Sequence, residues 1–218
     1  MFDEQVIMMI VRGIWETVYM TLLSTLLGYV LGLPYGILLV VTDKGGLHPN
    51  AVIYKILDVI ANIVRSVPFL ILLIVISPIT RVIVGKSYGS SATIVPLVAA
   101  ATPFIARMVE SSLKEVDKGV IEAALAMGAS NLKIITKVLL VESKTSLLVG
   151  ATIAIGTILG YSAMAGIIGG GGLGDIAIRY GYYRYQSDIM IVTVILLIIL
   201  VQIFQTVGMQ VAKRIDKR

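Results

Sequence analysis

Long apolar runs dominate this chain, and they restrict it to folds in which helices cross a lipid bilayer. Of its 218 residues, 57% are hydrophobic and 14% are charged, whereas a soluble domain carries about 25% charged residues. A helix needs about 20 predominantly apolar residues to cross the hydrocarbon core, and it satisfies its own backbone hydrogen bonds there. The sequence therefore predicts an all-α integral membrane protein.

Five segments are long and apolar enough to be membrane spans. They cover about residues 14–41, 56–84, 93–109, 146–168 and 189–211, so we expect a single transmembrane domain over residues 1–218. Residues 65–68 interrupt the second span near its start, and Pro78 interrupts it near its end. Gly28, Gly32 and Gly36 fall four residues apart in the first span, which leaves a bare helical face that another helix can approach closely.

The basic residues are distributed unevenly among the loops, and this bias predicts the orientation in the membrane. If the polar segment 115–141 is cytoplasmic, the same side also holds Lys44, Lys55, Arg107, Lys114, Lys118, Lys133, Lys137, Lys144, Lys213, Arg214, Lys217 and Arg218. The opposite side holds Arg12, Arg81, Lys86, Arg179 and Arg184. Because Lys- and Arg-rich loops stay cytoplasmic, we expect the N-terminus outside and the C-terminus inside. The cytoplasmic loops account for the net charge of +5, so we expect no nucleic-acid partner.

Residues 115–141 form a long polar segment that predicts two short helices. Its first apolar residues recur at three- and four-residue steps and would share one helical face: Val116, Val120, Ala123, Ala124 and Met127. Gly128 would end the first helix in a left-handed conformation, because it has no Cβ to clash. Ser130 would cap the second helix, whose apolar stripe would be Leu132, Ile135 and Leu139. Such a pair of helices indicates a docking element.

The same segment resembles the EAA loop of ABC importer permeases. The resemblance rests on Glu122-Ala123-Ala124, then three residues, Gly128, then nine residues and Val138-Leu139-Leu140-Val141, where the family usually ends in proline. It implies a type I ABC importer permease fold with a cytoplasmic coupling helix. The residues that it assigns to docking on a separate ATPase subunit are Glu122, Ala123, Ala124, Met127 and Gly128. A short amphipathic helix in a groove is a recurrent docking mode; a helix lying on the membrane surface is the alternative.

Further runs are similar to the methionine-importer subgroup of this family, namely residues 11–17, 65–69, 80–85, 103–110 and 160–164. This resemblance implies a homodimer in a bacterial inner membrane, with two copies of an ABC ATPase subunit. It also implies an extracytoplasmic substrate-binding protein that delivers D- or L-methionine for transport by alternating access. Without proline at Val141, the second loop helix could run on into the fourth span.

The same resemblance assigns the translocation path or gate to residues in two different spans: Arg65, Ser66, Pro68, Tyr161, Ser162 and Met164. Each group has a plainer interpretation. Arg65 could extend its long side chain to the membrane surface, and Met164 could be ordinary packing.

The remaining motifs give no sign of catalysis, a cofactor or a metal site. The chain has no cysteine and one histidine, and no nucleophile lies beside a base. Residues 169–174 satisfy G-x-G-x-x-G, but no strand precedes them, so we expect a flexible outward turn. The tyrosines in 180–185 suit a membrane-interface belt, with contact to a docking protein as a minor alternative.

The chain is therefore not expected to be an enzyme, and ATP hydrolysis would occur in a partner subunit. Three other functions are compatible with the sequence. The first is an ABC permease for another amino acid or small solute. The second is an ATP-independent secondary transporter, although such folds often show paired halves or intramembrane acids. The third is a membrane scaffold, which the proline- and glycine-broken spans disfavour.

Overall fold

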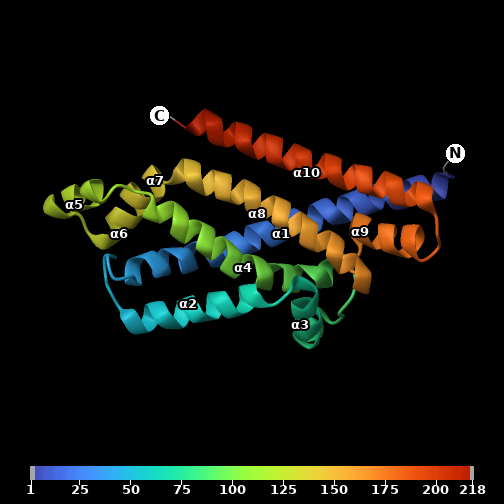
Figure 1. The fold of residues 1–218 in the computed structure, drawn as a ribbon, viewed down its shortest axis with the longest axis horizontal. Coiled ribbons are helices and arrows are strands. Elements are labelled where there is room, and N and C mark those ends of the chain that lie inside the picture. Colours follow the sequence, from blue (N-terminus) through green and yellow to red (C-terminus); the bar gives the residue numbers. More distant parts are fainter. Residues whose placement is uncertain (1–2, 217–218) are drawn as a thin grey trace.

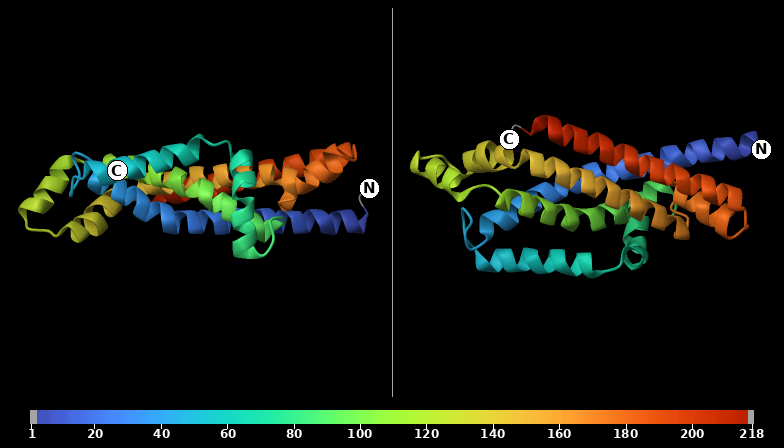
Figure 2. Two further views of the ribbon diagram at one scale, coloured as in Figure 1. Left: turned by 90° about the horizontal axis from the view of Figure 1, so that it is seen from below. Right: turned by 45° about the horizontal axis from the view of Figure 1, so that its top comes forward.

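Long helices lie side by side along the molecule (Figures 1 and 2). The computed structural model describes residues 3–216. In this range the elements are α1 (Glu4–Thr42), α2 (Ala51–Ser66), α3 (Phe69–Val84), α4 (Ser90–Lys114), α5 (Lys118–Ala126), α6 (Asn131–Lys133), the π-helical η1 (Ile134–Leu139), α7 (Leu140–Glu142), α8 (Lys144–Met164), the 3-10 turn η2 (Ala165–Ile168), α9 (Gly172–Ile176), the π-helical η3 (Ala177–Tyr182) and α10 (Ser187–Ile215).

Four stretches of the described chain are helical, long and apolar enough to cross a membrane: Glu4–Thr42, Ser90–Lys114, Lys144–Tyr182 and Ser187–Ile215. Helices α2 and α3 together make a fifth if the bent pair counts as one span. The predicted all-helical membrane fold is therefore confirmed, with four spans in the described residues, or five with the broken second one. Helix α1 begins ten residues before the predicted start at residue 14. It can do so because Asp3 caps it and because Arg12 and Glu16 pair with each other at 3.0 Å.

The predicted break of the second span at residues 65–68 is confirmed, although it lies in the middle of the helix pair because α2 begins at Ala51. Helices α2 and α3 are bent by 108°, and α3 runs across the long helices (Figure 2). Val67 between them has φ −79° and ψ 124°, the extended conformation that a following proline imposes on its neighbour. Pro78 lies inside α3 and does not end it.

Helices α1 and α4 pack against each other through the bare glycine face. A Cβ added to Gly32 would lie 2.9 Å from Thr102 O, and one added to Gly36 would lie 2.6 Å from Ala106 O. Ile105, on the facing side of α4, is fully buried. The predicted role of this glycine series in close helix packing is confirmed.

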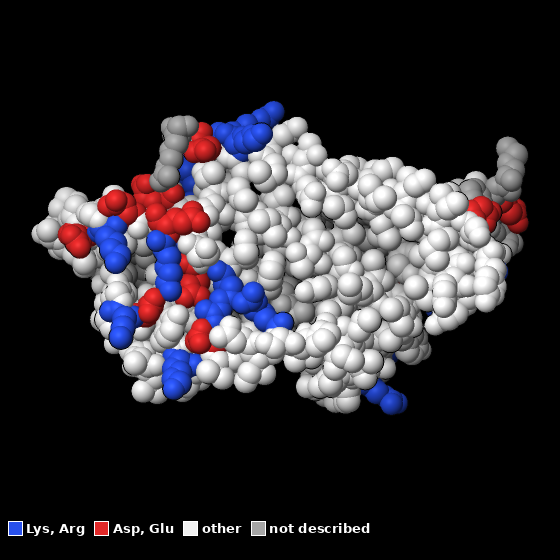
Figure 3. All heavy atoms as spheres, viewed as in Figure 1, with Lys and Arg blue, Asp and Glu red and all other residues white. Residues whose placement is uncertain are grey.

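The two ends of the molecule differ in composition. The α1–α2 loop, the elements α5 to α7 and the C-terminus lie toward one end, and the N-terminus lies at the other (Figure 1). Lys, Arg, Asp and Glu gather at the end that carries α5 and α6, while the middle of the surface is almost free of them in this view (Figure 3). This distribution is typical of a protein whose middle lies in lipid.

Candidate functional site

The coupling loop, residues 115–141, folds as two helical arms at the charged end. The first arm is α5, which begins after Asp117; the Oδ1 of this residue accepts a 2.6 Å hydrogen bond from Gly119 N. Gly128 has φ +76° and donates to Leu125 O at 2.9 Å, while Ala129 N donates to Ala124 O at 3.0 Å. These two bonds form a Schellman motif, so the predicted glycine stop is confirmed.

The α-helix Lys118–Ala126 places Val120, Ala123 and Ala124 on one face, as predicted, but these apolar residues are unevenly buried. Val116 precedes α5, and both it and Ala124 are buried in the core of the chain at 8% and 6% exposure. Val120 is 43% exposed and Met127 is 82% exposed. The arm therefore has one side packed on its own chain and another side open. Of the predicted docking residues, the exposed ones are Glu122, Ala123, Met127 and Gly128.

The second arm comprises α6, η1 and α7, and its winding differs from the prediction. Ser130 occupies the N-cap position, but its side chain makes no capping hydrogen bond. The buried residues are Ile134 and Leu139, whereas the predicted Leu132 is 71% exposed. The reason is the π-helical turn Ile134–Leu139, because i→i+5 hydrogen bonding brings residues five apart onto one face. Past Val141, only Ser143 separates this arm from α8.

An aromatic stack joins the start of α3, which follows the first group of predicted gate residues, to Tyr161 of the second group. The rings of Phe69 and Tyr161 lie 4.6 Å apart and within 4° of parallel. Pro68 directly precedes Phe69, and Met164, which is 47% exposed, follows Tyr161 by about one helical turn. Ser162 is buried and donates to Leu159 O at 2.7 Å, so its hydroxyl is used within its own helix. Arg65, Ser66 and Pro68 are all exposed.

Five side chains connect α1, α2 and α4 through a continuous row of ion pairs. The sequence did not predict this row. Glu110, only 5% exposed, accepts from Arg107 Nη1 at 2.7 Å and from Lys114 Nζ at 2.9 Å. Arg107 also pairs with Asp58 of α2, and Lys114 pairs with Asp43 at 2.7 Å. We call these five residues the ion-pair chain.

The ion-pair chain left only a partial signal in the sequence. Arg107, Glu110 and Lys114 are spaced by three and four residues, which places them on one face of α4. Nothing in the sequence points to the partners that α1 and α2 supply. The hydrogen bond from Lys114 is the main reason why the pKa of Asp43 lies below its ordinary value.

The glycine-rich segment 169–174 is not the flexible outward turn that we expected. Gly172 N donates to Glu16 Oε2 and Leu173 N donates to Thr17 Oγ1, both at 2.9 Å. A Cβ at Gly174 would collide with the backbone of Ala163. The glycines thus let this segment pack tightly between α1 and α8, and the expectation of flexibility was wrong.

Exposed tyrosines mark the end of the molecule opposite the coupling loop. Tyr182 and Tyr183 are each 63% exposed and Tyr185 is 89% exposed. The Arg184 guanidinium lies 4.6 Å from the centre of the Tyr180 ring. Their role in a membrane-interface belt stays a prediction.

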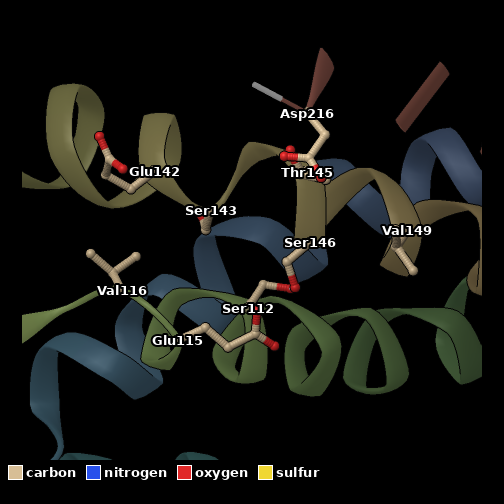
Figure 4. Close-up of a pocket in the computed structure, with 9 residues that line it drawn as sticks. All are labelled: Ser112, Glu115, Val116, Glu142, Ser143, Thr145, Ser146, Val149 and Asp216. Carbon is tan, nitrogen blue, oxygen red and sulfur yellow. The ribbon is translucent and has the colours of Figure 1, made fainter. Parts of the chain in front are cut away.

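A polar cavity of about 300 Å³ lies beside the root of the coupling loop. Figure 4 shows its lining residues, which come from the end of α4, the start of α8 and the C-terminal segment. Ser146 Oγ donates to Ser112 Oγ across it at 2.9 Å, and Glu115, Glu142 and Asp216 are among its lining residues. Within residues 3–216, no group of three or more His, Cys, Asp or Glu side chains is placed to hold a metal ion.

The chain combines a helical membrane domain with a two-armed polar loop at one end. Residues 24–218 match the family described as binding-protein-dependent transport system inner membrane component, and the chain belongs to this family. It is thus an inner-membrane transport component and not an enzyme.

Named relatives define the type of component more closely. The chain is 49% identical to the probable D-methionine transport system permease protein MetI of Vibrio cholerae, over 96% of this chain and 93% of that protein. It is 51% identical to the D-methionine transport system permease protein MetI of Escherichia coli K12, over 75% of this chain and 76% of that protein.

Solved structures agree with these relatives. A chain of the MetNI methionine ABC transporter in an inward-facing conformation has 47% identity and a TM-score of 0.97, covering 99% of this chain and 100% of that one. An amino acid ABC transporter crystallised with histidines has 17% identity and a TM-score of 0.79 over 98% of this chain and 99% of that one, which shows the fold alone. The expected resemblance to ABC permeases of the MetI type and the type I importer permease fold are confirmed.

Proposed function

We propose that this chain is the membrane-spanning subunit of an ATP-driven importer that carries methionine into the cytoplasm. The observation that carries this proposal is the near-complete match, at a TM-score of 0.97 and 47% identity, to a chain of a methionine ABC transporter. The geometry of the coupling loop supports it, because the loop offers an exposed helix end to a separate protein.

In this proposal the first arm of the coupling loop docks into a groove of an ABC ATPase subunit. Met127, Glu122 and Ala123 make the contact from the open side of α5. Ala124 contributes from the closed side, where its small side chain sets how deeply α5 sits on the core. Two copies of the chain pair, and each engages one ATPase subunit.

Transport proceeds by alternating access between the two faces of the membrane. Closure of the ATPase pair on ATP draws the two coupling loops together, and the spans repack so that the path opens outward to a loaded substrate-binding protein. The similarity to an inward-facing transporter favours the resting, inward-open state for the conformation described above. Residues around the Phe69–Tyr161 stack line the path, with Met164 as the gate.

The proposed orientation places the coupling loop and the C-terminus in the cytoplasm and the N-terminus outside. The charge distribution along the molecule (Figure 3) supports it. Because the chain has no cysteine, single cysteines at Gln5 and Lys213 report on it directly. A membrane-impermeant thiol reagent applied to spheroplasts should label Gln5→Cys and spare Lys213→Cys; the reverse pattern would invert the proposed topology.

The function itself is tested by reconstitution. The chain is coexpressed with the ATPase subunit, purified in mild detergent and placed in liposomes with the binding protein and labelled methionine. We expect the ATPase subunit to copurify in equal stoichiometry and uptake to require ATP. Uptake without ATP would support a secondary transporter instead. Unlabelled D-methionine, L-methionine and histidine are added as competitors, and displacement by histidine but not by methionine would overturn the substrate assignment.

A further inference from the structure

Helix α2 has little apolar packing to hold it in place. Ala61 is its one buried residue, at 0% exposure, while Val52, Ile56 and Ile63 on the same helix are at least half exposed. Its firm attachments are polar. Tyr35 of α1 donates to Leu57 O at 2.6 Å, and the remaining bonds come from the ion-pair chain.

The ion-pair chain attaches α2 to the end of α4 from which the coupling loop begins. Arg107 of α4 bonds both the side chain and the backbone carbonyl of Asp58, and it donates to Asn62 Oδ1 at 3.0 Å. Tyr54, also on α2, donates to Glu110 at 3.4 Å. Two turns of α2 are therefore fixed to one face of α4.

At its other end α2 continues into the proposed gate. The chain bends by 108° at Val67 and Pro68, and the next residue, Phe69, is buried and stacked on Tyr161 of α8. A displacement of α2 would thus reach the ring of Tyr161 through two residues of extended backbone. Tyr161 lies three residues before Met164.

The ion-pair chain is a poor device for stability alone. Its partly exposed pairs contribute little, and the desolvation of the buried Glu110 offsets much of the attraction to its partners. Its directional bonds do fix geometry, and they break if either partner moves away. An ion-pair chain suits a joint that must transmit movement between helices with little apolar contact.

We infer that α2 and α3 form a bent lever, that the ion-pair chain fixes this lever to the coupling loop, and that the lever moves the Phe69–Tyr161 stack at the gate. Asp58 and Arg107 are then positioning residues for transport, acting between two sites that they do not touch. The inference rests on the proposed function and adds the route by which the coupling loop controls the path.

The first test measures whether α2 and α4 move together. Spin labels are placed at Val59→Cys on α2 and at Ser111→Cys on α4, both exposed, in the complex with its ATPase subunit. Their distance is measured without nucleotide and with a trapped ATP analogue. The lever requires an unchanged distance in the parent chain and a changed one when Asp58→Ala is added. A distance that changes in the parent chain would overturn the inference, whether or not the complex transports methionine.

The second test separates transmission from assembly. Asp58→Ala should copurify with the ATPase subunit and hydrolyse ATP, but its methionine uptake per ATP should fall by at least about fivefold, the lower end of ordinary coupling between sites. Asp58→Asn keeps an oxygen that accepts from Arg107 and should recover part of the uptake. Lys55→Ala removes an exposed charge from the same helix and is the control. Wild-type uptake per ATP in Asp58→Ala would refute the lever, whereas loss of ATP-dependent uptake in every variant and in the parent would refute the proposed function.

Discussion

A single left-handed backbone angle at Gly128 sets the turn between the two arms of the coupling loop. Its φ of +76° is unfavourable for a β-branched residue, yet nothing lies within 4 Å of a Cβ placed there. The cost of substitution is therefore conformational, roughly 1–2 kcal/mol for an ordinary L-residue. We predict that Gly128→Val reduces copurification of the ATPase subunit and lowers uptake per ATP. Gly128→Asn, which adds a side chain but tolerates this conformation, should stay close to the parent. Equal behaviour of the two variants would show that the angle is unimportant.

The stability that Asp43 contributes at the junction of α1 and α4 should depend on pH. Its pKa in the folded chain is lowered from 3.8, chiefly by the hydrogen bond from Lys114. A carboxyl with a lowered folded pKa contributes stability above its unfolded pKa and loses it as the pH falls through the folded value. Asp43→Asn should therefore melt at a lower temperature than the parent at pH 7, and the gap should narrow below pH 3.8. Thermal unfolding in detergent measures both, and a constant gap would contradict the assignment.

Residues whose role follows from their own backbone could be predicted from the sequence, and residues whose role depends on a distant partner could not. The stop at Gly128 belongs to the first kind. Asp43 and Asp58 belong to the second, because only the fold brings them to α4. Leu132 was assigned to the wrong face because the π-helical turn at 134–139 changes the spacing of buried residues from the usual three or four to five.

At the scale of elements, the α1–α4 interface depends on the absence of side chains. A Cβ at Gly36 would lie 2.6 Å from both Ala106 O and Val109 Cβ. Both distances are shorter than a van der Waals contact, so α1 and α4 would have to move apart. We predict that Gly36→Ala separates the helices and lowers the free energy of unfolding by about 1–3 kcal/mol, as overpacking does. Gly160→Ala, in α8 with nothing within 4 Å, is the matched control and should be neutral or stabilising because alanine favours helix. Thermal unfolding of both variants decides this, and equal destabilisation would argue against a packing cause.

The elements themselves were visible in the sequence wherever length and hydropathy define them. Helices α4 and α10 contain the predicted third and fifth spans with a few extra residues at their ends, because caps and terminal charges lie outside the apolar window. Helix α8 ends at Met164, and the predicted fourth span continues through the 3-10 turn to Ile168. The right-angled turn between α2 and α3 was underestimated, since hydropathy continues across Pro68 and records no change in direction. The segment 169–174 was misjudged because glycine is used both for flexibility and for close packing, and only the neighbouring Glu16, Thr17 and Ala163 distinguish the two.

At the scale of the whole molecule, the charged coupling-loop end and the tyrosine-rich end lie at opposite ends of the long axis. The ion-pair chain and the coupling loop lie toward one end, whereas the tyrosines 182–185 and the glycine segment lie toward the other. The proposed gate residues lie between them, at the bend of α2 and α3 and at the end of α8. A transporter of this design must connect ATP hydrolysis at one end with an opening that its coupling loop does not touch, so the gate is where the whole arrangement can be tested.

Met164 and Ile167 offer a matched pair for that test, with 47% and 48% of their surfaces exposed in the single chain. Met164 ends α8 one turn beyond the Tyr161 stack, and a flexible thioether can close on solutes of varied shape. If it closes the path, Met164→Ala should let preloaded liposomes lose labelled methionine without ATP and should lower net uptake per ATP hydrolysed. Ile167→Ala removes a similar apolar side chain and should do neither. A tight, fully coupled Met164→Ala complex would leave Met164 as packing, and the gate would then have to be sought at the Phe69–Tyr161 rings themselves.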